Sequence, residues 1–176
     1  MLLEHRDTDA DLLDQNSQTP LSLAAQFGRE GVVKMLLGRE DVDPDSLGRT
    51  GRTPLSFAAE SGHEGVVRLL LESGVVNPDS MDEDGRTTLS LAAESGREGV
   101  VKVLLEREDV DPNSPDRAGR KPLSFATECG HEGVVMLLLE RGVVNLDLSD
   151  LDGRKPLSHA AESESGRFQS ESVGPG

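Results

Sequence analysis

Large aromatic side chains are scarce in this sequence of 176 residues. It contains four phenylalanines but no tyrosine and no tryptophan, so aromatic residues make up 2% of the chain. Globular cores usually rely on large rings for much of their buried area, and their scarcity argues against one thick core. Leucine, valine and alanine must fill the interior instead, which they do well in thin, closely spaced layers.

Clustered positive charge is also lacking. The chain has 18 Lys and Arg residues against 33 Asp and Glu residues, which gives a formal net charge of −15 at pH 7. Binding to nucleic acid phosphates or to an anionic membrane surface requires clustered Lys and Arg, whereas the basic residues here are scattered among acidic ones. We therefore expect neither nucleic acid nor membrane among the partners of this protein.

Two further absences concern the cellular compartment. Cys129 is the single cysteine, which excludes an internal disulfide and is typical of a reducing compartment. The opening MLLEHRDTDADLL has no apolar stretch of signal-peptide length, and no segment of the sequence reaches the ~18 apolar residues of a membrane-spanning helix. These features predict a soluble, intracellular protein of the cytoplasm.

What the sequence does contain is an internal period of 34 residues. The segment GRTPLSFAAESGHEGVVRLLLE (51–72) returns in closely similar form from Gly85 and from Gly119. Two marker positions give the same step. They are Pro20, Pro54, Thr88, Pro122 and Pro156 for the first marker, and Gly28, Gly62, Gly96 and Gly130 for the second. Periods of this length are typical of solenoids, in which each unit buries its apolar face against its neighbours.

Each unit predicts two helices followed by a hairpin. Thr53 is expected to cap the first helix, which has proline at its first position, and Gly62 is expected to end it in the left-handed conformation. The second helix, HEGVVRLLLE (63–72), is apolar over more than half of its circumference, so neighbouring units must cover it on more than one side. The dipeptide Asp84-Gly85 that follows is typical of hairpin tips.

The segment GRTPLSFAAESGHEGVVRLLLESG resembles the ankyrin repeat, with its G-x-T-P-L-H-x-A-A-x-x-G-H core. The resemblance covers nearly the entire chain and implies an all-α repeat solenoid of stacked antiparallel helix pairs, with projecting hairpin loops and a concave groove. Because partial units stand at both ends, we expect a segment of a longer array or a truncated gene product. The implied divisions are 1–16 as the C-terminal part of a preceding repeat, 17–50, 51–84, 85–118 and 119–152 as repeats 1 to 4, 153–165 as the first half of repeat 5, and 166–176 as a flexible tail.

Several departures from the ankyrin pattern predict only moderate stability. The period is one residue longer than the usual step of the family, and serine replaces the histidine after T-P-L, so an imidazole network is absent there. Lys121 and Lys155 stand where threonine caps other first helices, at an expected cost of ~1 kcal/mol per helix. Glycine near the start of a second helix costs up to ~1 kcal/mol relative to alanine. These glycines are Gly31, Gly65, Gly99 and Gly133.

No arrangement of residues predicts catalysis, a metal site or a cofactor site. His63 and His131 share the sequence GHEG, but two units separate them by roughly 20 Å, so they cannot share a metal. We interpret both as structural residues at a helix start. Segment 80–91 opens like a calcium loop but ends with Leu91 where glutamate is required. Cys129 has no adjacent histidine or lysine in the sequence to activate it, and we expect a non-enzymatic protein without a cofactor.

Residues 34 apart stack one above another along a solenoid, so positions outside the packing pattern form ladders. Two of these ladders are charged, and the resemblance places both on the inner face that ankyrin proteins use for partners. They contain Arg52, Arg86, Arg120 and Arg154, and Glu60, Glu94, Glu128 and Glu162. Two interpretations stay open. The charges are solvated Arg–Glu pairs worth ~0–1 kcal/mol each, or they recognise a partner, with a basic segment lying against the glutamates.

The first unit interrupts both ladders with Gln18, Gln26 and Phe27. Phe27 stands where the next two units have serine. It is either an interface hot spot, a residue that packs on a neighbouring unit, or a shield for the open end, and these alternatives stay open. Phe57 and Phe125 fall at an inward position instead and are expected in the core.

The resulting hypothesis is a non-enzymatic protein–protein interaction scaffold that binds a partner protein through its hairpin tips and first-helix concave face. The residues expected to contact the partner are Arg52, Arg86, Arg120, Glu60, Glu94, Glu128 and Phe27. The alternative is a regulatory or sensing ankyrin segment of a larger multidomain enzyme or signalling protein. A monomer, or weak head-to-tail association through the open ends, is the expected state of assembly.

Overall fold

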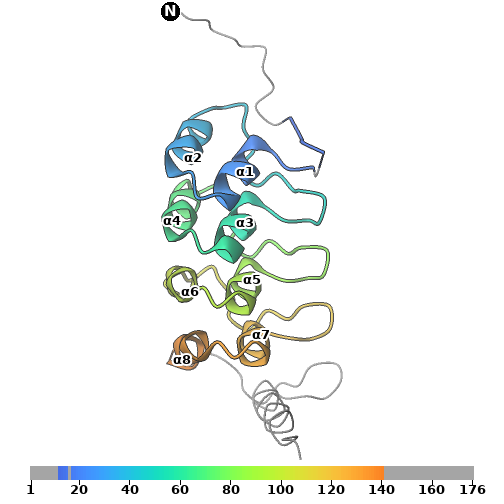
Figure 1. Cartoon of the computed structure of the whole chain (residues 1–176), viewed down its shortest axis with the longest axis vertical. Helices are drawn as coiled ribbons and strands as arrows, with labels where there is room; N and C mark the ends of the chain where they lie inside the picture. The colour runs from blue at the N-terminus through green and yellow to red at the C-terminus, as the bar shows by residue number, and fades with distance from the viewer. Residues whose placement is uncertain (1–11, 16, 141–176) are drawn as a thin grey trace, which may run out of the picture.

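Paired helices make up the regular structure of the chain (Figure 1). The computed structural model describes residues 12–140, apart from residue 16. The start of the chain, the expected fifth unit (153–165) and the tail (166–176) lie outside the described residues. The described helices are α1 Pro20–Gln26, α2 Glu30–Leu37, α3 Pro54–Ser61, α4 Glu64–Glu72, α5 Thr88–Glu94, α6 Glu98–Leu105, α7 Pro122–Glu128 and α8 Glu132–Glu140. Of these described helices, none is both long enough and apolar enough to cross a membrane.

The helices lie in two parallel rows within one elongated stack (Figure 1). The first row contains α1, α3, α5 and α7, and the second contains α2, α4, α6 and α8. Each helix packs on its neighbours in the row and on the other helix of its own pair. The loops that join one pair to the next project beside the first row (Figure 1). This arrangement confirms the predicted all-α solenoid of stacked antiparallel helix pairs.

The first helices begin and end as the sequence predicts. Thr53 Oγ1 accepts the N–H of Ser56 at 3.2 Å, and threonine caps α1 and α5 in the same way. Ser56 Oγ in turn donates to Thr53 O at 2.8 Å, so the serine that replaces the family histidine takes part in a smaller local network. Gly62 ends α3 with a φ of +85°, in the left-handed region that favours glycine.

A thin apolar layer between the two rows forms the core. Its buried side chains are those of leucine, valine and alanine, as the scarcity of aromatic residues predicts. Leu55, Leu70 and Leu104 are completely buried. Phe57 and Phe125 are buried as well, which confirms their expected place in the core. Because each layer is covered by helices of the adjacent repeats, one helix pair could not bury this surface alone.

Backbone hydrogen bonds join the projecting hairpins to one another. The N–H of Glu83 donates to Thr50 O, and the N–H of Arg117 donates to Asp84 O, both at 3.0 Å. Gly85 at the tip has a φ of +80°, which permits the tight turn predicted for Asp84-Gly85. Successive hairpin tips are therefore held at a regular spacing.

Lys121 is the exception among the caps of the described first helices. Its side chain has no acceptor atom, so α7 lacks the side-chain cap that threonine supplies to the other three. Lys121 is nevertheless buried, and its Nζ has no hydrogen-bond partner. Burial lowers the pKa of this ammonium group, and the nearby charge of Asp111 opposes that shift in part.

Replacing Lys121 with threonine is expected to stabilise the protein by about 1–2 kcal/mol, because it restores the cap and removes a buried unpaired cation. Thermal unfolding followed by circular dichroism should show a Tm higher by several degrees. The gain should shrink as the pH rises from the lowered pKa of Lys121 toward that of free lysine, since the buried group then loses its charge. The reverse change, Thr87→Lys, should lower the Tm. A Lys121→Thr protein no more stable than the native chain would contradict this account.

Candidate functional site

The two charged ladders meet on the first-helix face, which we define as the surface formed by the hairpins at 46–53, 80–87 and 114–121 and by α1, α3, α5 and α7. In three successive repeats the arginine pairs with the glutamate of the same repeat. The pairs are Arg52–Glu60 at 2.6 Å, Arg86–Glu94 at 3.2 Å and Arg120–Glu128 at 3.6 Å between the closest charged atoms. The structure thus brings these six candidate residues together as three ion pairs. Arg154 and Glu162 lie outside the described residues.

Two of the arginines are each held by an aspartate of their own hairpin. Arg86 donates through Nε and Nη2 to Asp82 Oδ2 at 3.0 and 2.9 Å. Asp82 Oδ1 accepts the backbone N–H groups of Asp84 and Arg86, and Asp116 holds Arg120 in the same way. Sequence reasoning missed these aspartates, although the recurring D-x-x-G-R could have indicated them.

The arginines are more buried than the glutamates in two of the three pairs. The side chains of Arg52 and Arg86 are each 18% exposed, whereas those of Glu60 and Glu94 are 37% and 38% exposed. In the third pair, Arg120 and Glu128 are exposed to a similar extent. Along α3 and α5 the face therefore presents carboxylate groups rather than guanidinium groups to solvent.

The first repeat replaces the ion pair with an uncharged one. Gln18 Nε2 donates to Gln26 Oε1 at 3.2 Å, at the positions that Arg52 and Glu60 hold in the next repeat. Phe27 follows directly at the end of α1 and is 60% exposed. This end of the first-helix face is therefore neutral and partly apolar, in contrast to the charged surface along the next three repeats.

His63 and His131 have the structural role that the sequence indicates. Each Nε2 lies 2.9 Å from a backbone carbonyl oxygen at the end of the preceding first helix. Because a carbonyl can only accept, Nε2 carries the proton of the imidazole. Arg97 makes the equivalent contact, with its Nε 2.9 Å from the carbonyl oxygen of Glu60. These three side chains connect the starts of α4, α6 and α8 to the first helix of the repeat before each.

Cys129 is not activated as a nucleophile. Its thiol is exposed just after α7. Desolvation and the carboxylates of Glu94 and Glu128 raise its pKa. The thiolate fraction at neutral pH is therefore reduced, whereas a catalytic cysteine requires the opposite shift. Within the part of the chain that the structure describes, no group of three or more His, Cys, Asp and Glu side chains could hold a metal ion.

Two further aspartates connect consecutive repeats through the loops after the second helices. Asp45 Oδ2 accepts the N–H of Asn77, and Asp79 Oδ2 accepts that of Asp111, both at 2.9 Å. The other oxygen of each carboxylate is buried and has no hydrogen-bond partner. Burial raises the pKa of both groups above the ordinary aspartate value. Their contacts join the loops of adjacent repeats, and sequence reasoning did not identify them.

Comparison with known families agrees with this geometry. A family model of three ankyrin repeats matches residues 32–116, and a model of the single ankyrin repeat matches residues 118–151, so that together they cover more than half of the chain. A search of curated proteins found no match. Ankyrin repeats are generally protein–protein interaction modules, and proteins built from them are typically non-enzymatic scaffolds. On the evidence of its period, its helix pairs and these two matches, the chain belongs to the ankyrin repeat family.

Proposed function

We propose that this protein binds a partner protein through its first-helix face, and that a basic segment of the partner lies along Glu60, Glu94 and Glu128. The observation that carries the proposal is the repeated Arg–Glu pair, present in three successive repeats. In the first two pairs the arginine is the more buried member and the glutamate the more exposed one. A partner that approaches this surface therefore meets a row of carboxylates at a fixed spacing.

The spacing of the glutamates indicates what kind of basic segment fits. Adjacent packed helices lie about 8–10 Å apart, so the carboxylates of consecutive repeats are separated by about one such step. A peptide in the polyproline II conformation advances about 3.1 Å per residue and returns to the same face every third residue, so basic residues at every third position would match the row. The net charge of −15 would also speed the encounter with a basic partner.

The neutral end of the face favours a second, apolar contact. Phe27 is exposed beside the uncharged Gln18–Gln26 pair, at one end of the row of carboxylates. Exposed aromatic residues that become buried on binding commonly contribute much of the affinity. A partner with an apolar residue at one end of its basic segment would therefore bind in a single direction along the stack.

A charge-to-alanine comparison tests the proposal. The variant with Glu60, Glu94 and Glu128 replaced by alanine should bind the partner about tenfold more weakly than the native chain, since each exposed charge contributes a fraction of a kcal/mol. The measurement is a crosslinking pull-down from cell extract, followed by titration of the captured partner at two salt concentrations. Binding by the native chain should weaken with salt more steeply than binding by the variant.

The chain offers a matched control in a second glutamate ladder. Glu30, Glu98 and Glu132 are exposed in the first turns of α2, α6 and α8, and their replacement by alanine removes the same charge from the other row of helices. This control should keep the partner. If both triple variants lose it equally, only total charge matters, and if neither loses it, the first-helix carboxylates do not recognise the partner. Either result would sink the proposal.

A further inference from the structure

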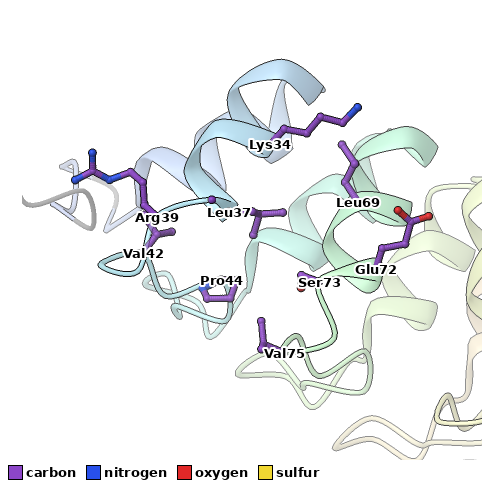
Figure 2. A pocket seen from close by; sticks show the side chains of 10 residues that line it. Lys34, Leu37, Arg39, Val42, Pro44, Leu69, Glu72, Ser73 and Val75 are labelled. Atoms are coloured by element: carbon purple, nitrogen blue, oxygen red, sulfur yellow. The ribbon is translucent and has the colours of Figure 1, made fainter.

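A groove lies in the second row of helices, between the ends of α2 and α4 and the loops that follow them (Figure 2). Its volume is about 590 Å³. Leu37 of α2 and Leu69 of α4 form apolar walls, and Val75 lies below them in the loop after α4 (Figure 2). Lys34 and Glu72 extend from the two opposing helices at its rim (Figure 2). Arg39 also lines the groove and pairs with Asp41 at 2.6 Å. The groove therefore combines an apolar floor with charges of both signs, and Lys34 and Glu72 are the two that face each other across it.

The equivalent groove at the next junction, between α4 and α6, is much smaller. Its volume is about 160 Å³. Glu72 and Arg107 line it, whereas the first groove has Gly38 and Ser73 at the corresponding positions, 34 residues earlier in the chain. The first groove thus has two small residues where the second groove has two long side chains, and it stays open for that reason.

A loop residue increases the apolar character of the first groove. Val75 is 67% exposed, and it stands where the next repeat has Asp109, which pairs with Arg107 at 2.6 Å. The second groove therefore has a charged pair at its edge, whereas the first groove has a serine and an exposed valine at the same two positions. Isolated exposed apolar residues are common, but this one continues the surface formed by two partly buried leucines.

An ion pair also distinguishes the two grooves. Arg68 of α4 lies 3.6 Å from Glu106, across the mouth of the second groove. Lys34 and Glu72 hold the corresponding positions in the first groove, 34 residues earlier. Within residues 12–140, apart from residue 16, no ion pair joins these two side chains. Among the described residues, Lys34 and Glu72 therefore lack the counter-charge that Arg68 and Glu106 supply to each other.

We propose that the open groove is a second docking site, which receives a short amphipathic segment of another protein. An apolar side chain of that segment lies between Leu37, Leu69 and Val75. An acidic residue of the segment faces Lys34, and a basic residue faces Glu72. Charge complementarity is the basis for this choice. At the second groove Arg68 and Glu106 neutralise each other, whereas at the first groove the bound segment supplies an opposite charge to Lys34 and to Glu72. The binding mode is that of an apolar anchor with flanking charges that fix its direction.

This site is separate from the one under the proposed function. The groove lies in the second row of helices, whereas the Arg–Glu pairs lie on the first-helix face, and no residue belongs to both. A partner could therefore occupy the groove whether or not another occupies the first-helix face. Substitutions on one surface should leave binding at the other unchanged, which makes the two proposals independently testable.

A double substitution closes the groove with residues that this chain already uses. Gly38→Glu together with Ser73→Arg installs the side chains of the second junction. Gly38 has a φ of −79°, and a Cβ there would make only ordinary contacts at 3.6 Å, so the change is compatible with folding. Ser95→Arg, at the end of α5, is the matched control because it adds the same side chain to the other row of helices. Thermal unfolding of all variants verifies that they fold.

The probe is a library of short random peptides displayed on phage. The library is first depleted on the closed-groove variant and then selected on the native chain. We expect the remaining peptides to share an apolar residue flanked by an acidic and a basic residue. Synthetic copies should bind the native chain and the Ser95→Arg control equally, and the closed-groove variant at least about tenfold more weakly. The triple glutamate variant of the first-helix face should bind them like the native chain.

Three outcomes would overturn the proposal. Depletion could remove every binding peptide, or the selected peptides could lack the pattern of flanking charges. In the third outcome, analytical ultracentrifugation would show a dimer of the native chain that the closed-groove variant fails to form. The groove would then receive a second copy of this chain rather than a segment of another protein.

Discussion

Replacing Gly96 with alanine is expected to destabilise the protein by about 2–4 kcal/mol. Gly96 has a φ of +66°, a conformation that costs an ordinary L-residue about 1–2 kcal/mol. A Cβ at this position would lie 2.6 Å from Nδ1 of His131, so the imidazole ring must move. Its movement would break the contact between Nε2 and the carbonyl of Glu94, at a further cost of about 1 kcal/mol or more.

Two comparisons separate the backbone strain from the collision. Gly74 also has a positive φ, +73°, but a Cβ there would meet no atom within 4 Å, so Gly74→Ala measures the strain without a collision. In a His131→Ala background the ring is absent, and Gly96→Ala should then cost about as much as Gly74→Ala. The measurement is the free energy of unfolding from denaturant titration. Equal costs for Gly96→Ala and Gly74→Ala in the native background would show that the histidine contact has no importance.

Replacing Asp82 with alanine is expected to destabilise the protein by about 2–3 kcal/mol. The Asp82 side chain is 3% exposed and accepts hydrogen bonds from the N–H groups of Asp84 and Arg86 and from the Arg86 guanidinium. Removing this buried carboxylate leaves those N–H donors without a hydrogen-bond acceptor. Because Arg86 keeps its contacts with Glu94 and Asp84, the loss should be smaller than that for a fully buried ion pair.

The same hairpin provides the control for this prediction. Asp84 is 72% exposed and contacts Arg86 at 3.2 Å, so Asp84→Ala should change the free energy of unfolding by about 1 kcal/mol or less. Both variants remove one carboxylate from the same turn, and denaturant titration compares them directly. Similar losses for the two would mean that the hairpin depends on its net charge rather than on the buried anchor.

Local features of the fold were predictable because they depend on residues close together in the chain. Thr53 and Gly62 set the limits of one helix through contacts within a few residues, and these limits were confirmed. Phe57 was assigned to the core from the period alone and is buried. The repeated sequence then extends the same local result to each unit.

Part of the candidate site followed from the period, and part did not. Residues 34 apart form ladders in any solenoid of this period, so the rows of arginines and glutamates were predictable from the sequence. Their pairing within each repeat, and the anchor beneath Arg86, depend on how the hairpin folds back toward the first helix. Asp82 was missed because aspartate is common in turns for purely local reasons, and its sequence neighbours do not show which side chain it holds.

The repeat length, the two helices of each unit, the thin aliphatic core and the ladders of charge could all be predicted from the order of the residues. These features follow from short-range backbone preferences and from a period that places equivalent residues one above another. Which charges pair and which groove stays open became clear from the folded arrangement of the repeats. The charge pairs depend on how each hairpin folds back toward its own first helix. The groove depends on how far side chains of adjacent repeats reach across a junction, and at the first junction Gly38 and Ser73 leave unfilled the space that Glu72 and Arg107 fill at the second.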